Sequence, residues 1–98
     1  MGNETQVKRI SRMEEVLEEG TRVVKELEMA LDRYEAYSGN IRELEAYYTD
    51  GRWKNDFTDE EAGRISSAVK RGVLSEDAVY DFLTMRDQVL ARCGRMKR

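Results

Sequence analysis

The fold of this chain is decided by residues 10–34, which read ISRMEEVLEEGTRVVKELEMALDRY. Uncharged residues recur there at alternating steps of three and four, namely Ile10, Met13, Leu17, Gly20, Val24, Leu27, Leu31 and Tyr34. This spacing predicts one long amphipathic helix with a single apolar face. The face is widened on one flank by Val16, Val23, Ala30 and Tyr37. Three apolar positions in every seven residues are typical of a helix in a bundle.

Length and composition also favour a small helical protein. The chain has 98 residues, the size of a single domain over residues 1–98, and contains no proline that would interrupt a helix. Residues 1–61 hold 9 Lys and Arg against 16 Asp and Glu, a net charge of −7. Residues 62–98 hold 8 against 4, a net charge of +4. We therefore expect the two parts to attract each other, within the chain or between copies.

The long helix is expected to cover residues 4–37. Ser38-Gly39-Asn40 is typical of a break, with Asn40 as the capping residue of a short helix over residues 40–48. The apolar face also runs on through Ser38, Ile41 and Leu44. A single continuous helix is therefore the alternative.

Capping residues predict the elements that follow. Thr58 with Glu61 forms a capping box, Gly72 is expected to end that helix, and Ser75 is expected to cap the last one. The remaining elements are an aromatic loop over residues 49–57, a helix over 58–71, a helix over 75–93 and a basic tail over 94–98. The predicted fold is all-α, a small helical bundle in which one long N-terminal helix packs against three shorter helices.

Two separated motifs carry a resemblance to a known family. The first runs from Tyr47 to Phe57 and contains Tyr-Tyr, Trp and Asp-Phe; the second is KRGVLSEDAVY over residues 70–80. Both are similar to motifs of a small bacterial family, domain of unknown function 4298, and the likeness covers nearly the whole chain. The resemblance implies a bacterial, intracellular, stand-alone helical protein. It implies no activity and no functional residues.

Catalytic and metal-binding chemistry finds little support in the residues. The chain has no histidine and one cysteine, Cys93, which we interpret as structural or incidental. Four glutamates over residues 14–19 resemble a carboxylate metal site, but such sites also take histidine, so we interpret them as a solvated face. Residues 50–61 have the length of a calcium loop, but Arg52 and Lys54 occupy ligand positions. We expect no enzyme activity, no metal and no cofactor.

Nucleic-acid binding through the basic C-terminal region, residues 64–98, is an alternative function. Residues 64–83 can be compared with a helix-turn-helix. Asp81, however, falls where a recognition helix should pack inward. The end that would read DNA, Ser75-Glu76-Asp77, is acidic and would be repelled by phosphates.

The aromatic segment is the candidate site for binding a partner protein. It comprises Tyr47, Tyr48, Arg52, Trp53 and Phe57. Trp and Tyr beside Arg are typical of interaction hot spots. The competing interpretation, which we favour, is that these rings cover the open end of the bundle.

A second candidate surface serves self-association. The shorter helices are too short to cover the whole stripe of the long helix, so its first part is expected to be covered by a second copy. The residues concerned are Ile10, Met13, Leu17 and Gly20. We expect a homodimer.

The sequence indicates a cytoplasmic protein without a membrane segment, because its uncharged runs are only a few residues long. Together with the missing chemistry, the aromatic segment favours a non-catalytic interaction protein. We expect an adaptor or a small regulatory subunit with an unidentified protein partner.

Overall fold

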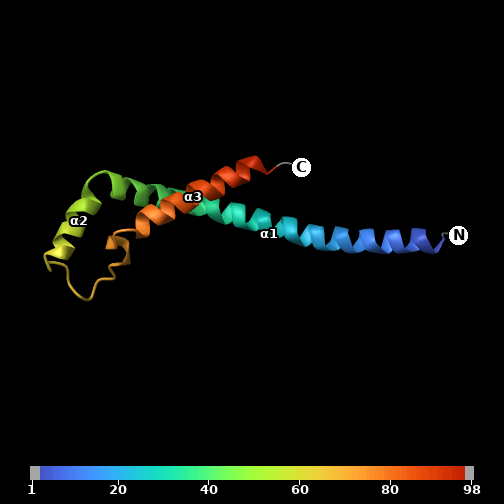
Figure 1. Cartoon of the computed structure of the whole chain (residues 1–98), viewed down its shortest axis with the longest axis horizontal. Coiled ribbons are helices and arrows are strands. Elements are labelled where there is room, and N and C mark those ends of the chain that lie inside the picture. The colour runs from blue at the N-terminus through green and yellow to red at the C-terminus, as the bar shows by residue number, and fades with distance from the viewer. Residues whose placement is uncertain (1–2, 97–98) are drawn as a thin grey trace. The chain divides into compact units, whose positions relative to one another are not determined.

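A computed structural model describes residues 3–96, and in that part of the chain every regular element is a helix (Figure 1). The elements are α1 over Glu4–Thr49, α2 over Arg52–Glu61, the short 3-10 helix η1 over Gly72–Leu74, and α3 over Ala78–Arg95. The predicted all-helical class and the long N-terminal helix are confirmed. Among residues 3–96, no helix combines the length and the apolar character that a membrane span requires.

Residues 38–40 lie inside α1, so the predicted break there is wrong and the alternative of one continuous helix is confirmed. The Ser38 hydroxyl donates a hydrogen bond to the Glu35 carbonyl, 2.9 Å away, within the helix. An interior glycine such as Gly39 costs a helix only about 1 kcal/mol. The apolar face meanwhile continues to Ile41, which is buried. A separate short helix over residues 40–48 therefore does not form.

The expected loop over residues 49–57 is also wrong, because α2 begins at Arg52. The turn between α1 and α2 is confined to Asp50 and Gly51, and Gly51 has the positive φ of 99° that favours glycine. One Asp50 carboxylate oxygen accepts the Arg52 backbone N–H at 3.1 Å. Trp53 and Phe57 are four residues apart and share one face of α2. Their spacing is the helical signal in this segment.

The predicted helix over residues 58–71 is wrong at both ends. Thr58 lies within α2, which ends at Glu61, and residues 62–71 are irregular. Gly63 ends the helix in the left-handed conformation, with φ 76°. Its N–H bonds the Glu60 carbonyl at 3.0 Å, and the Arg64 N–H bonds the Asp59 carbonyl at 2.9 Å. This is the Schellman termination, and glycine favours it.

The last helix is displaced from its predicted bounds of 75–93. α3 begins at Ala78, so its capping position is Asp77 and not the predicted Ser75. The Asp77 side chain makes no capping hydrogen bond. The Ser75 N–H instead bonds the Gly72 carbonyl at 3.2 Å and closes η1. At the other end Arg95 belongs to α3 rather than to the tail over residues 94–98. Residues 97 and 98 of that tail lie outside the described part.

Contacts divide the chain into two compact units, residues 1–38 and residues 39–98. The first unit consists of one helical segment, and a single helix cannot bury its own apolar face. Its large apolar side chains are accordingly exposed, including Leu17 at 64% and Val24 at 65%. All four candidate residues for self-association, Ile10, Met13, Leu17 and Gly20, are exposed as well.

The second unit holds the buried side chains of the described chain. Its core consists of Ile41 from α1, Leu74 from η1 and Val79 from α3. η1 contacts both α2 and α3. This small core therefore depends on a single turn of 3-10 helix between two longer elements.

Candidate interaction surfaces

The first surface is the apolar face of α1, which we call the α1 seam. It comprises Ile10, Met13, Leu17, Gly20, Val24, Leu27, Leu31 and Tyr34, with Val16, Val23 and Ala30 on one flank. None of these residues is charged, and the large ones up to Leu31 are 44–65% exposed. A continuous exposed apolar strip of this kind makes the α1 seam a candidate interaction surface.

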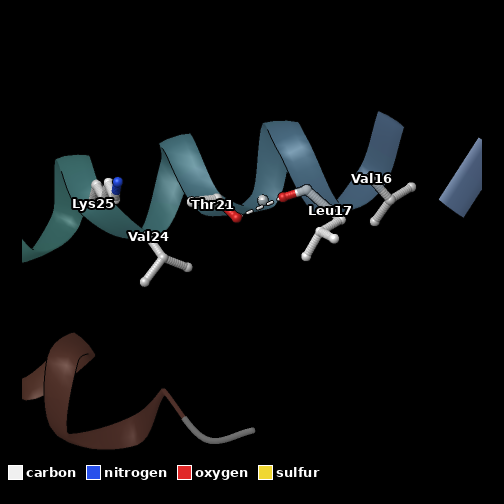
Figure 2. Close-up of a pocket in the computed structure, with 6 residues that line it drawn as sticks. Val16, Leu17, Thr21, Val24 and Lys25 are labelled. Carbon is white, nitrogen blue, oxygen red and sulfur yellow. Dashed lines mark hydrogen bonds between the residues drawn. The ribbon is translucent and has the colours of Figure 1, made fainter. Parts of the chain in front are cut away.

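A shallow hollow interrupts the seam at Gly20. It is lined by Val16, Leu17, Gly20, Thr21, Val24 and Lys25. Figure 2 shows Val16, Leu17 and Val24 pointing to the same side of the helix. The Thr21 hydroxyl bonds the Leu17 carbonyl at 2.7 Å and is thereby occupied within the helix. A Cβ added at Gly20 would meet no atom within 4 Å, so the hollow is open.

Charged residues occupy the outer faces of the same segment. Lys8 pairs with Glu4 at 4.0 Å, Arg12 with Glu15 at 3.5 Å, and Arg22 with Glu19. All six side chains are more than 60% exposed, and such pairs contribute little to stability. The segment is thus divided into a charged exterior and an uncharged seam.

The second surface is the aromatic cluster at the junction of α1 and α2. Its members are the five predicted residues, and the structure brings them together in two groups: Tyr48 with Trp53 and Phe57, and Tyr47 with Arg52. The Trp53 ring lies between two others. It stacks on Phe57 with ring centres 4.9 Å apart and meets the edge of Tyr48 at 5.2 Å. The cluster is therefore a packed unit of side chains from two helices.

Trp53 also fastens η1 to α2. Its indole N–H donates to the Val73 carbonyl, 2.8 Å away and 20 residues further along the chain. The Trp53 side chain is half-buried. A shallow hollow beside it is lined by Tyr48, Trp53, Lys54, Phe57, Thr58, Glu61 and Glu76. Because two ring contacts and the polar atom of Trp53 are already used, the cluster holds this unit together.

Tyr47 forms the polar edge of the cluster. Its hydroxyl donates to the Asp56 carboxylate at 2.7 Å, and the Arg52 guanidinium lies 5.6 Å from the centre of its ring. Burial, followed by this hydrogen bond to Asp56, raises the pKa of Tyr47 to about 12. The Arg52 side chain also bonds Asp50, which lowers the pKa of that carboxyl. The Tyr47 phenol thus stays protonated and acts as a donor at neutral pH.

We expect Tyr47 to titrate at a higher pH than an ordinary tyrosine phenol. The unfolded phenol has a pKa of 10.0 and the folded one a pKa of about 12. The stability that Tyr47 contributes is therefore present below pH 10 and is lost as the pH rises towards 12. Difference absorbance of tyrosinate between wild type and Tyr47→Phe measures this titration. Asp56→Asn should move it to lower pH, and a Tyr47 signal with its midpoint at pH 10.0 would contradict the assignment.

Sequence reasoning missed the pair Glu45 and Arg86, which joins α1 to α3 within the second unit. The two terminal nitrogens of the Arg86 guanidinium, Nη1 and Nη2, donate to the two carboxylate oxygens of Glu45, at 3.2 and 3.0 Å. Arg86 also bonds Asp87. The hydrogen bonds lower the pKa of Glu45 and raise that of Arg86. A signal existed in the sequence for Arg86, whose neighbours three and four residues away are Phe82, Leu83, Val89 and Leu90.

The alternative sites are less well supported. No group of three or more metal-ligating side chains occurs among residues 3–96. The segment compared with a calcium loop is largely α2, and residues 64–71, which a helix-turn-helix requires to be helical, are irregular. Arg64, Arg71 and Arg86 of the basic region are paired with Asp59, Glu60 and Glu45. Cys93 is exposed.

Comparison with known proteins assigns a family. Residues 10–96 match the family described as domain of unknown function (DUF4298). No curated protein and no solved structure matches the chain.

Proposed function

The chain belongs to the family of this domain of unknown function, DUF4298, and on that basis we propose a function from its surfaces. It is a non-catalytic protein–protein interaction protein, of the adaptor or small regulatory kind, that works as a homodimer joined along α1. The proposal includes a bacterial source and a cytoplasmic location.

The observation that supports this proposal is the exposure of the α1 seam. Most of the stability of a protein helix comes from packing its apolar face, because helix propensity alone is marginal in water. Burying an exposed Leu or Val side chain contributes roughly 1.5–3 kcal/mol. A seam with Leu17, Val24, Leu27 and Leu31 exposed therefore offers a large gain to any helix that covers it.

We further propose that the bundle expected from the sequence is completed between molecules. Its three apolar positions in seven residues suit a helix with more than one neighbour.

The aromatic cluster has a supporting role in this proposal. Its rings contact one another and Trp53 uses its N–H on Val73. We therefore place the interface on α1 and assign the cluster to holding α2 against η1.

Sedimentation velocity of the wild-type chain, from low to high micromolar concentration, tests the proposal. We expect a species of twice the 11.4 kDa chain mass whose proportion rises with concentration. A species of single-chain mass at every concentration would contradict the homodimer.

A further inference from the structure

We propose that the two copies pair antiparallel along α1, with Leu17 of each copy seated in the hollow at Gly20 of the other. This inference rests on the homodimer proposed above and specifies its geometry. It follows from the side-chain pattern of the seam and from the position of the hollow.

The seam has the heptad repeat of a coiled coil. Its a positions are Ile10, Leu17, Val24 and Leu31, and its d positions are Met13, Gly20, Leu27 and Tyr34. In such pairs each a or d side chain enters a hole made by four residues of the facing helix, spaced i, i+3, i+4 and i+7. Leu17, Gly20, Thr21 and Val24 have this spacing, and all four line the observed hollow (Figure 2). The hollow therefore fits one apolar side chain of a second helix.

Gly20 decides between the two directions of pairing. In a parallel, in-register pair each d position faces its own copy, so Gly20 would face Gly20 and leave a void in the middle of the seam. Voids in packed interfaces are costly. In an antiparallel pair an a position faces a d position, so a large side chain can fill the hollow. The glycine thus favours antiparallel helices.

The flanks of the seam favour the same direction. The g positions are the apolar Val16, Val23 and Ala30, whereas the e positions include Glu14 and Glu28. Parallel helices place g beside e, which would put Val23 against Glu28 of the second copy. Antiparallel helices place g beside g and e beside e, so the apolar g flanks join each other on one side of the seam. This arrangement keeps Val16, Val23 and Ala30 away from Glu14 and Glu28.

The register follows from the same residues. When the two helices cross between Glu18 and Glu19, Leu17 lies opposite Gly20, Ile10 opposite Leu27, and Met13 opposite Val24. A shift of one heptad would bring Glu14 beside Glu28 of the second copy, where like charges repel. We therefore assign the register centred between Glu18 and Glu19.

Distances between spin labels test the direction and the register. Single labels are placed through Lys8→Cys or Glu19→Cys in the full chain carrying Cys93→Ser, because Cys93 is exposed. At about 1.5 Å per residue, the two Glu19 labels should lie at nearly the same level and the two Lys8 labels about 30 Å apart along the axis. Short distances at both sites would indicate a parallel dimer, which overturns this inference and leaves the homodimer standing. An absence of dipolar coupling at both sites would contradict the homodimer itself.

Gly20→Leu tests the interlocking of Leu17 with the hollow. In the single chain the new side chain enters open space, and it improves helix propensity by roughly 1 kcal/mol. If the hollow receives the second copy's Leu17, the added side chain overfills the seam and should raise the dissociation constant at least tenfold. A tighter dimer would overturn the interlocking, because the leucine would then have extended an unfilled seam.

Discussion

Leu17→Glu is expected to convert the dimer into a monomer and to reduce the helix content of α1. Leu17 lies at the centre of the seam and is 64% exposed in the single chain, so the substitution strains nothing within one molecule. In the dimer it places a carboxylate against apolar side chains with no partner for its charge. We expect the dissociation constant to rise by about 100-fold or more. Sedimentation velocity measures the association and far-ultraviolet circular dichroism the helix.

The matched control is Met29→Glu, which makes the same kind of change on the opposite face of the same helix. Met29 is 70% exposed and lies at an outer position of the heptad. Met29→Glu should leave both the dissociation constant of the dimer and the helix signal within experimental error of wild type. Equal weakening by the two substitutions would mean that added negative charge, and not the seam, controls association, and the proposed interface would then be wrong.

The long helix was predictable because its signal is repeated over many turns. Eight uncharged positions at steps of three and four leave no other regular structure, whereas one local break signal at residues 38–40 competes with the same pattern continuing to Ile41. In the structure the pattern prevailed, because a glycine or serine lowers helix stability only slightly when the flanking turns are well formed. Long periodicity is therefore better evidence than a single turn-forming tripeptide.

The short elements were predicted poorly because their ends depend on contacts from elsewhere. Thr58 with Glu61 has the sequence of a capping box, but the aromatic packing of Trp53 begins the helix earlier, at Arg52. Gly63 ends α2 in the left-handed conformation, whereas the predicted end of that helix was Gly72. The packing of Trp53 therefore accompanies the early start of α2, and the local conformation of Gly63 accounts for its early end.

The members of the aromatic cluster could be named from the sequence, but their partners could not. Clustering of rings predicted that Tyr48, Trp53 and Phe57 act together, and they do. The Val73 carbonyl is a backbone atom of η1, and no side-chain pattern identifies it as the acceptor for Trp53. Long-range hydrogen bonds to the backbone require the fold to be known.

Trp53→Ala is expected to destabilise the unit of residues 39–98 by about 3 kcal/mol. The substitution removes the ring between Tyr48 and Phe57 and also the hydrogen bond to Val73, which contributes about 1 kcal/mol. A unit of this size has a total stability of only roughly 3–9 kcal/mol, so the loss is a large share of it. Urea unfolding followed by circular dichroism measures the change.

Two controls separate the contributions. Trp53→Phe keeps an aromatic ring and removes the N–H donor, so it should cost about 1 kcal/mol. Tyr80→Ala removes a ring that is 62% exposed and should change the free energy of unfolding by less than about 0.5 kcal/mol. If Trp53→Ala is as stable as Tyr80→Ala, the aromatic cluster does not hold this unit together. Its rings would then be free to bind another protein, and the partner site would move from α1 to the cluster.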